Sequence, residues 1–458
     1  MSVLRFLAQP RPNWLESRPV QRAEPVRVGA RSQDLATLGS HEPVRRGPRV
    51  AYFTSRFPKL TETFVLYELL AVRRAGLEVR LYPLQREHAE TCHPEAAQVV
   101  EEAEFTPMFA AGTLWAAHLH FLVRDPGAYL RTLWHLLRAN WGSWRYWWGA
   151  VGFFPKAVLL ARKLEATGVQ HLHAHFASHP AAVAYVVQAL TGIPFSFTAH
   201  GSDLHRDQHM LREKVAAADF VVAISSYNRD FMIRVCGESA GERIHVIHCG
   251  VDLARFPFRQ EPTPYELGES PLQITCIGSL HEVKGQTYLL QACRLLRERG
   301  LDFTCHVVGD GEDARGLRWQ AEQAGLNRQI VFHGPLPQPA ICELLRTTDL
   351  LVVPSVPTRS GRREGIPVVL MEAMASGVAV VASQLSGIPE LVEHAMTGLL
   401  VPPRDVGAIA DAIERLASDP SLRRQLTRAA RQKVETDFDL EQNARRLAKC
   451  FVGENPEC

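Results

Sequence analysis

Residues 49–84, RVAYFTSRFPKLTETFVLYELLAVRRAGLEVRLYPL, contain the pattern that decides the fold. An apolar run at Arg49–Thr54 opens this stretch. Apolar residues at helical spacing follow it: Val65, Leu69 and Val72. Gly76 suits the position just beyond this helix, because glycine adopts the left-handed conformation without a Cβ penalty. A second apolar run at Val79–Leu84 completes a strand–helix–strand unit, which predicts a parallel sheet.

The same alternation of short apolar runs and helical stretches continues in two series along the chain. The first series comprises Val169–His175, Phe195–Thr198, Phe220–Ile224 and His245–Ile247. A break rich in Pro, Glu and Gly at Arg259–Pro271 separates it from the second series. The second comprises Ile274–Gly278, His306–Gly309, Ile330–His333, Leu350–Val353, Val378–Ala382 and Leu399–Val401. We therefore expect an α/β protein of two doubly wound domains, with the functional site in the cleft between them.

The composition excludes several classes of protein. With 46% hydrophobic and 22% charged residues, the chain of 458 residues is not a disordered one. Lys and Arg total 51 against 49 Asp and Glu, and the resulting net charge of +2 provides no basic field for nucleic acid. The 9 cysteines include no CxxC pair, which favours a reducing compartment over a disulfide framework.

The N-terminal residues and the apolar runs predict the localisation. Residues 1–48 have no apolar core followed by a cleavage site, so we expect no secretory signal. No uncharged apolar stretch reaches the length of about 18 residues that a spanning helix needs. We expect a cytoplasmic protein that is peripheral at the inner face of the cytoplasmic membrane. Residues 1–48 would form a flexible arm whose arginines are solvated or contact anionic lipid or a partner: Arg5, Arg11, Arg18, Arg22, Arg27, Arg31, Arg45 and Arg46.

Residues 363–377, REGIPVVLMEAMASG, carry the densest signal for chemistry. Pro367 suits the first turn of a helix, and Gly377 suits its end. Glu364 would then lie just ahead of the helix and Glu372 within it. Both carboxylates could face one ligand beside a helix N-terminus that favours phosphate. The alternative is an amphipathic helix with two solvated acids.

Several other blocks accompany this pair of glutamates. The pair lies in EGIPVVLMEAMASGVAVVAS, which is followed by GIPE at 387–390. The others are SRFPKLTETF, HLHAHFA, FTAHGSDL, ISSYNRDF, HCGVDLARF, GSLHEVKG and VVGDGE. From about Ala51 to Leu447, the chain resembles the retaining glycosyltransferases of family 4, and most of all the branch that builds bacterial exopolysaccharides such as colanic acid. The resemblance implies the GT-B fold, in which two Rossmann-like domains face each other across a cleft.

This resemblance and the apolar pattern together divide the chain into five segments. They are the arm 1–48, an N-terminal acceptor-side domain 49–258 with an aromatic and basic helical segment 105–160, a linker 259–272, a C-terminal nucleotide-sugar-binding domain 273–436, and a C-terminal helix 437–458 that returns to the N-terminal domain.

The family's roles, carried over by position, imply a donor site in the second domain. Glu364 would contact hydroxyls of the donor sugar, Glu372 would accept hydrogen bonds from the nucleotide ribose, and Lys284 would neutralise the diphosphate. Family members commonly have an arginine after the first glycine of the lysine block, where this chain has Ser279, which carries no charge. Three loop arginines could supply that charge or simply face water: Arg359, Arg362 and Arg363.

His200 matches the family's active-site histidine near the donor sugar, and Gly201 lets backbone approach it closely. Asp203 is expected to cap the following helix. The turn Gly309–Gly311 is too short for a dinucleotide fingerprint, which disfavours hydride transfer, but it would let a nucleotide approach the backbone. The implied catalytic residues are His200, Glu364 and Lys284. The implied donor-binding residues are Ser279, Lys284, Gly309, Gly311, Glu364, Gly365, Ile366, Pro367 and Glu372.

The acceptor side of the expected site is the turn after the first strand. In place of the family's common glycine pair, this turn contains Arg56, Thr61 and Glu62. Thr61 and Thr63 could cap or open the helix, whose free N–H groups would point into the cleft. Glu62 could orient an acceptor hydroxyl, or it could serve only at the helix start.

Metal binding is the weaker interpretation of two further patterns. His171, His173 and His175 alternate and so share one face of a strand, as zinc ligands could, but no Asp or Cys with suitable spacing follows them. The sequence Asp437-Phe438-Asp439 precedes a helical stretch, and N-capping explains it better than metal binding does. We expect no metal and no cofactor beyond a nucleotide diphosphate sugar as co-substrate.

Six of the 8 tryptophans lie in the segment 105–160: Trp115, Trp134, Trp141, Trp144, Trp147 and Trp148. Five basic residues accompany them against the single acid Asp125: Arg124, Arg131, Arg138, Arg145 and Lys156. Aromatic rings and cations on helices are typical of a contact with an anionic membrane surface. The alternative is a pair of helices packed on the sheet with their aromatic rings buried.

The expected function is transfer of a sugar, with retention, from a nucleotide diphosphate sugar to a hydroxyl of a lipid-linked oligosaccharide. Two other functions stay open. A nucleotide-sugar epimerase of similar fold would turn over the donor without an acceptor, and a non-catalytic, membrane-associated assembly subunit would not consume it.

Overall fold

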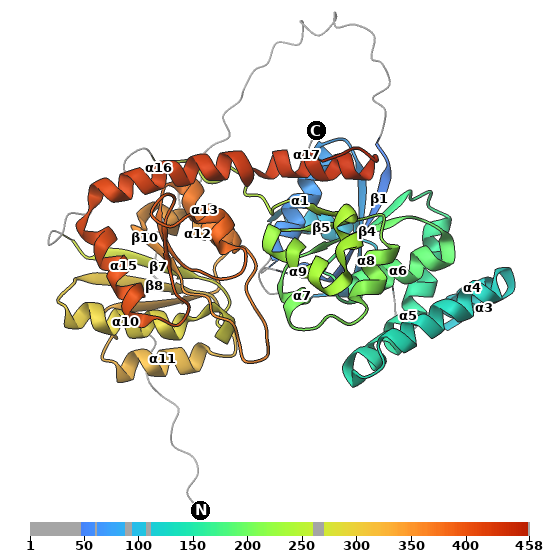
Figure 1. The fold of residues 1–458 in the computed structure, drawn as a ribbon, viewed down its shortest axis with the longest axis horizontal. Coiled ribbons are helices and arrows are strands. Elements are labelled where there is room, and N and C mark those ends of the chain that lie inside the picture. The colour runs from blue at the N-terminus through green and yellow to red at the C-terminus, as the bar shows by residue number, and fades with distance from the viewer. Residues whose placement is uncertain (1–46, 60–61, 88–93, 107–110, 260–269, 457–458) are drawn as a thin grey trace, which may run out of the picture. The chain divides into compact units, whose positions relative to one another are not determined.

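The described residues form two parallel six-stranded sheets, each flanked by helices (Figure 1). The structure is a computed structural model and describes residues 47–59, 62–87, 94–106, 111–259 and 270–456. The arm up to residue 46 and the candidate Thr61 lie outside these residues. The predicted α/β fold of two doubly wound domains is confirmed.

The first sheet has the strand order β2-β1-β3-β4-β5-β6. Its strands are β1 (Arg49–Phe57), β2 (Glu78–Arg86), β3 (His171–His175), β4 (Phe195–Ala199), β5 (Phe220–Ala223) and β6 (Ile244–Val246). The order reverses at β1, which pairs with β2 on one side and with β3 on the other. Ligands of doubly wound sheets bind beyond the carboxyl ends of the strands at such a reversal. The turns after β1, β3 and β4 are therefore the natural walls of a site.

The second sheet repeats this plan with the order β12-β11-β10-β7-β8-β9. Its strands are β7 (Leu272–Ile277), β8 (Phe303–Val308), β9 (Ile330–Gly334), β10 (Leu350–Val353), β11 (Ala379–Ser383) and β12 (Leu399–Val401). The order reverses at β7, which lies between β8 and β10. The turns after β7, β8 and β10 are the corresponding walls in this domain.

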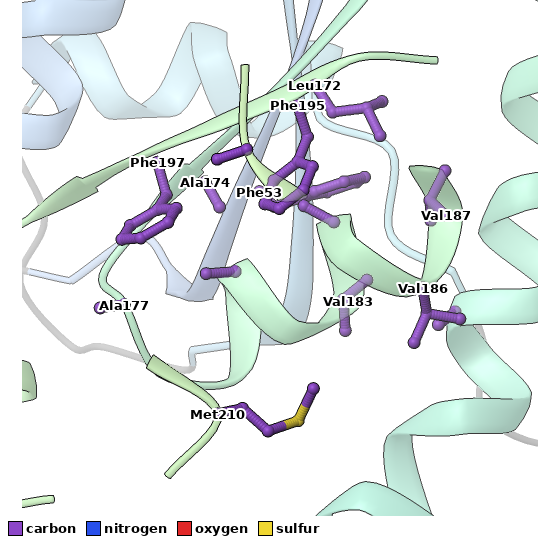
Figure 2. Packing of buried hydrophobic residues seen from close by; sticks show 14 of the residues in the cluster. Phe53, Leu172, Ala174, Ala177, Val183, Val186, Val187, Phe195, Phe197 and Met210 are labelled. Atoms are coloured by element: carbon purple, nitrogen blue, oxygen red, sulfur yellow. The ribbon is translucent and has the colours of Figure 1, made fainter. Parts of the chain in front are cut away.

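Helices cover both faces of the first sheet, which explains why β4 and β5 are buried along their whole length. The helices α1 (Thr63–Arg74) and α17 (Leu440–Phe451) pack together on one face. The helices α5 (Trp144–Glu165) and α6 (His179–Thr191) cover the other face. Figure 2 shows this second layer, in which α6 lies against the strands. Its apolar side chains belong to the same buried cluster as those of the strands: Val183, Val186, Val187, Phe53, Leu172, Phe195 and Phe197.

The chain returns to the first domain at its C-terminal end. The helix α16 (Pro420–Asp437) packs in the second domain, and α17 then buries Leu447 and Phe451 in the core beneath α1. The Asp439 side chain accepts a hydrogen bond of 2.7 Å from the Gln442 backbone N–H. The N-capping role predicted for Asp439 is therefore confirmed.

The remaining helices connect the strands and place the turns around the site. In the first domain they are α2 (Pro94–Glu102), α7 (Ser202–His205), α8 (Leu211–Ala217), α9 (Ser226–Cys236) and η2 (Glu238–Arg243). In the second they are η3 (Glu282–Lys284), α10 (Gln286–Glu298), α11 (Ala314–Gln323), α12 (Gln338–Thr347), α13 (Val368–Ser376), α14 (Ile388–Leu391) and α15 (Val406–Ser418). Pro367 was expected in the first turn of α13, but the helix begins at Val368 and Pro367 takes the N-cap position with extended backbone.

The aromatic segment forms the helices α3 (Ala111–Arg124) and α4 (Pro126–Ala139) and the first half of α5. Many of its large apolar side chains are exposed: Trp115 74%, Leu119 63%, Val123 75%, Leu130 56%, Trp134 64%, Trp141 78%, Trp144 76% and Trp148 50%. Burial of most of these rings, the alternative weighed above, is therefore wrong for this segment. Among the described residues, no helix combines the length and the apolar character needed to cross a membrane.

Candidate active site

A cavity of about 440 Å³ lies where turns of the two domains meet. From the first domain it is lined by residues that include Glu62, Phe64, Phe176, His200 and Cys249. From the second it is lined by residues that include Ser279, Lys284, Gly309, Gln338, Arg362, Arg363, Glu364, Gly365, Ile366, Pro367 and Glu372. All three residues expected to be catalytic thus line one cavity. Gly311 and Arg56 do not line it.

The turn after β7 brings Lys284 to the cavity. Its ammonium Nζ lies 2.8 Å from the Glu364 carboxylate Oε2, and both side chains are largely buried. Gly285 makes this turn possible, because its φ of +69° is unfavourable for other residues and an added Cβ would lie 1.9 Å from the Pro354 carbonyl oxygen. The cation and the carboxylate therefore neutralise each other at the cavity wall.

The glycines of the turn after β8 let it pack against the turn that holds Lys284. An added Cβ at Gly309 would lie 2.0 Å from the Gly278 carbonyl oxygen, and one at Gly311 would lie 2.2 Å from the Leu280 carbonyl oxygen. Gly309 is part of the cavity wall. Gly311 does not line the cavity but allows the two turns to pack closely.

The diphosphate clamp expected of the family is incomplete at Ser279, which lines the cavity without a charge. Two of the three loop arginines, Arg362 and Arg363, line the same cavity, and Arg363 donates a hydrogen bond of 3.1 Å to the Tyr227 hydroxyl. Arg359 does not line it. The two arginines bring positive charge to the wall of the cavity.

Glu372 lines the cavity, and 6% of its surface is exposed. Burial raises the pKa of this carboxyl to about 7, although a hydrogen bond of 3.1 Å from the Gln338 amide Nε2 lowers it in part. Gln338 in turn accepts a hydrogen bond from the Tyr67 hydroxyl of the first domain. Sequence reasoning missed Gln338, which begins α12 without a recognisable motif.

His200 follows β4, and Asp203 holds its turn in place. One Asp203 oxygen accepts hydrogen bonds from the backbone N–H groups of His200 (3.0 Å) and Gly201 (2.8 Å), and the other accepts from Ala177 (2.6 Å). Burial raises the pKa of Asp203, while these amides oppose the shift. The expected helix-capping role is wrong, because Asp203 lies inside α7 and binds amides of two turns instead.

The ring of His200 is buried between two aromatic side chains. The centroids of Phe64 and Phe176 each lie 4.7 Å from that of the imidazole. Burial holds the pKa of His200 well below its ordinary value. His200 is therefore a neutral imidazole at the cavity wall.

Only some of the residues expected on the acceptor side line the cavity. Glu62 lines it at the N-cap position of α1, makes no capping hydrogen bond, and pairs with Lys59 at 2.5 Å. Thr63 is the first residue of α1 and also lines the cavity. Arg56 instead donates to the Gln85 side chain at 3.0 Å, away from the cavity.

The three histidines of β3 do share one face, as their alternation predicts. Glu68, His173 and His175 offer ligand atoms that lie within 4.8 Å of one another, as a metal would require. Sequence reasoning missed Glu68 because it searched for an acid after the strand, whereas Glu68 comes from α1. Both ring nitrogens of His173 already contact hydroxyls, of Ser196 at 2.8 Å and of Thr198 at 3.0 Å. These contacts favour a hydrogen-bonded network over a metal site.

Glu390, from the GIPE block, joins the two domains beside the cavity. Its carboxylate accepts hydrogen bonds from the backbone N–H groups of Ser226 (2.8 Å) and Tyr227 (2.9 Å) at the start of α9. Burial would raise the pKa of Glu390, but His248 and these amides hold it below its ordinary value. An acid at a helix N-terminus is favourable, so this contact stabilises the packing of α14 against α9.

The fold and the cavity together define the class of protein. The structure of Alr3699/HepE from Anabaena in complex with UDP and glucose has a TM-score of 0.62 and 17% identity, covering 88% of this chain and 99% of that one. Sucrose-phosphate synthase from Thermosynechococcus elongatus has a TM-score of 0.63 and 18% identity, covering 89% of this chain and 98% of that one. The chain thus has the two-domain GT-B fold of glycosyltransferases.

Sequence comparison narrows this class to a family. The family model "Glycosyltransferase Family 4" matches residues 61–255, and "Glycosyl transferases group 1" matches residues 258–433. A protein of Escherichia coli (strain K12) described as a colanic acid biosynthesis glycosyltransferase, WcaL, is 30% identical over 431 residues, covering 87% of this chain and 98% of WcaL. The amylovoran biosynthesis glycosyltransferase AmsK of Erwinia amylovora is 33% identical over 257 residues, or 55% of this chain and 61% of AmsK. The chain belongs to this glycosyltransferase family.

Proposed function

We propose that this glycosyltransferase moves a sugar, with retention of configuration and without a metal, from a nucleotide diphosphate sugar to a hydroxyl of a lipid-linked oligosaccharide in bacterial exopolysaccharide biosynthesis. The observation that carries the proposal is the convergence of Lys284, Glu364 and Glu372 on one cavity between the domains. The relatives from colanic acid and amylovoran biosynthesis support the exopolysaccharide context.

The cavity offers a partner for each part of such a donor. Glu372, a buried residue of its wall, would accept hydrogen bonds from the ribose hydroxyls. Lys284, Arg362 and Arg363 would face the diphosphate, together with the free N–H groups at the start of α13. Glu364 would accept hydrogen bonds from the sugar. The nucleotide seen with Alr3699/HepE, a protein of the same fold, supports this choice of ligand.

Donor binding would rearrange the ion pair of Lys284 and Glu364. Hydroxyls of the sugar would bind Glu364, and the diphosphate would take its place beside the Lys284 ammonium. As the bond from the anomeric carbon to the diphosphate breaks, charge grows on the leaving oxygen, where preorganised cations lower the barrier most. The acceptor oxygen bonds to the same face of the anomeric carbon, and its proton passes to the departing phosphate.

The acceptor would approach from the side of Glu62 and the start of α1, which line the cavity in the first domain. Among the described residues, Glu62 is paired with Lys59, and its carboxylate could exchange that contact for an acceptor hydroxyl. Thr63 lies beside it at the first position of the helix.

The exposed aromatic face of α3–α5 would hold the enzyme on an anionic membrane, where a lipid-linked acceptor resides. Trp115 and Trp134 present their rings outward on α3 and α4. Arg131 and Arg138 are exposed on α4, and neither α3 nor α4 contains an acid, since Asp125 lies in the connection between them. Rings at headgroup depth and cations beside anionic lipid are the two components of interfacial binding.

A donor screen followed by a transfer assay tests the proposal. Nucleotide sugars are first ranked by the rise in melting temperature that they cause, since a ligand that binds only the folded state stabilises it. The best donor is then incubated with and without a lipid-linked oligosaccharide. Nucleotide release that requires the acceptor supports transfer. Turnover of the donor alone indicates an epimerase, and binding without turnover indicates an assembly subunit.

A further inference from the structure

A chain of polar side chains leads from the sheet interior of the first domain to His200. The Tyr52 hydroxyl donates a hydrogen bond of 3.3 Å to Glu68 Oε1, and this oxygen lies 3.3 Å from His175 Nε2. On the other side of the ring, His175 Nδ1 lies 3.2 Å from His200 Nε2. The chain ends where Cys249 Sγ lies 3.9 Å from His200 Nδ1.

Most of the side chains in this hydrogen-bonded series are buried, so each contact affects their stability. Tyr52 and His175 are fully buried, and His200 is 7% exposed. His175 Nε2 has no aligned hydrogen-bond partner among the described residues, and the Glu68 carboxylate is the group within reach. A buried N–H group without a partner is costly, so a donor at this nitrogen would turn towards Glu68.

The chemistry of the groups sets the direction of the hydrogen bonds. An ionised carboxylate only accepts, so His175 Nε2 carries the proton that faces Glu68. With a single N–H on its ring, at Nε2, His175 accepts a hydrogen bond at Nδ1. His200 must then donate from Nε2, and its Nδ1 is left without a proton. The Cys249 thiol beside that atom is a weak donor.

We propose that Glu68 is a positioning residue: through His175 it fixes the tautomer of His200, so that His200 Nδ1 remains a hydrogen-bond acceptor beside Cys249 on the cavity wall. The consequence for catalysis rests on the proposed function. A hydroxyl of the donor sugar would replace the weak thiol contact and donate to Nδ1. The same site would hold a sugar derivative without that hydroxyl less tightly.

The tautomer is measured directly, without any substrate, by long-range ¹H–¹⁵N spectra of protein labelled with [¹⁵N]histidine. The variants His200→Ala and His175→Ala identify the two sets of signals. In the wild-type protein we expect a protonated Nε2 and an unprotonated Nδ1 at His200. In Glu68→Gln we expect a mixture of tautomers, because an amide can donate as well as accept.

Three spectroscopic results would overturn the proposal. They are a His200 protonated at Nδ1 in the wild-type protein, a His175 protonated at both nitrogens, and a Glu68→Gln spectrum identical to the wild-type one. The first two need only the wild-type chain for their readout, so they decide the matter even if Glu68→Gln does not fold. The spectra test the tautomer of His200 even if the protein is not a glycosyltransferase.

A double-mutant cycle tests whether Glu68 affects activity through His200 or through the general stability of the fold. Glu68→Gln is expected to lower kcat/KM for the donor about tenfold in the wild-type background, as loss of a supporting contact commonly does. In the His200→Ala background it should lower the residual activity less than about twofold. Tyr52→Phe, which removes the other partner of Glu68, is the matched control and should change kcat/KM less than about twofold. Equal losses from Glu68→Gln in both backgrounds would contradict a role through His200.

Discussion

Lys284 Nζ and Glu364 Oε2 lie 2.8 Å apart at the wall of the cavity. The positive charge of Lys284 is therefore already paired with a carboxylate before a donor binds. The two residues come from different turns, after β7 and ahead of α13. An ion pair so placed holds both side chains in position. It also means that Glu364 and an incoming diphosphate compete for one cation.

This competition predicts opposite effects of two substitutions on the binding of a free nucleoside diphosphate. Lys284→Ala should weaken binding about tenfold or more, because a charge-assisted contact to phosphate is lost. Glu364→Gln should leave binding unchanged or tighten it, because Lys284 is freed, even though sugar transfer falls. Calorimetric titration measures both. Equal weakening by the two substitutions would show that the ion pair does not compete with the ligand.

The pKa of about 7 at Glu372 predicts that donor affinity depends on pH. Below pH 7 the carboxyl is mostly protonated, and ribose hydroxyls that donate to a carboxylate must first drive off its proton. Affinity for an intact nucleotide sugar should therefore rise between pH 6 and pH 8 and level off above. The diphosphate of such a donor is esterified at both ends and does not titrate in this range.

Glu372→Gln is the control for this pH dependence. The variant should bind the donor more weakly at pH 8 and show little change in affinity from pH 6 to pH 8, because an amide does not titrate. An identical slope in the variant and the wild-type protein would assign the dependence to another group.

The hydrogen bonds of Asp203 predict that replacing this residue lowers the free energy of unfolding strongly. Asp203→Ala leaves three buried backbone N–H groups of the His200 and Ala177 turns without an acceptor. We expect the free energy of unfolding to fall by about 3 kcal/mol. Asp439→Ala, which removes one exposed N-cap contact, should cost only about 1 kcal/mol. Denaturant unfolding compares the two, and equal losses would refute the role of Asp203.

The exposed aromatic face predicts binding to liposomes that contain phosphatidylglycerol. Replacing Trp115, Trp134 and Trp144 together by serine should lower the cosedimented fraction several-fold, because apolar area at headgroup depth is lost. Trp319→Ser is the matched control, since this ring is 64% exposed on α11 of the second domain and should not matter. Binding should also weaken with salt, which screens the arginines. Equal cosedimentation of both variants would contradict the assignment.

The strands of both sheets could be predicted from the sequence because each contains a short apolar run, as in FVVA of β5, which is buried along its whole length. The donor side of the site could be predicted for a similar reason. Glu364 and Glu372 lie in one continuous block at the start of a helix, so local spacing already places them together. Pro367 shows the limit, because the helix boundary was missed by one residue.

Contacts between distant segments could not be predicted in this way. Glu68 meets His175 only because α1 packs across β3, and Gln338 meets Glu372 only because α12 lies beside α13. No spacing in the chain signals either pair. Likewise, the sequence shows that tryptophans are enriched in segment 105–160, but not whether another element covers their rings. That depends on tertiary packing, which here leaves Trp115 and Trp134 exposed.

If Lys284 and Glu364 support acceptor-dependent sugar transfer, their loss must slow the release of nucleoside diphosphate in the presence of an acceptor. Release of nucleoside diphosphate from the best donor is measured with and without a lipid-linked oligosaccharide for the wild-type protein, Lys284→Ala, Glu364→Ala and the remote control Lys433→Ala. We predict acceptor-dependent release by the wild-type protein and Lys433→Ala, and release at least about a hundredfold slower by the other two folded variants. Full activity of Lys284→Ala or Glu364→Ala would contradict the account.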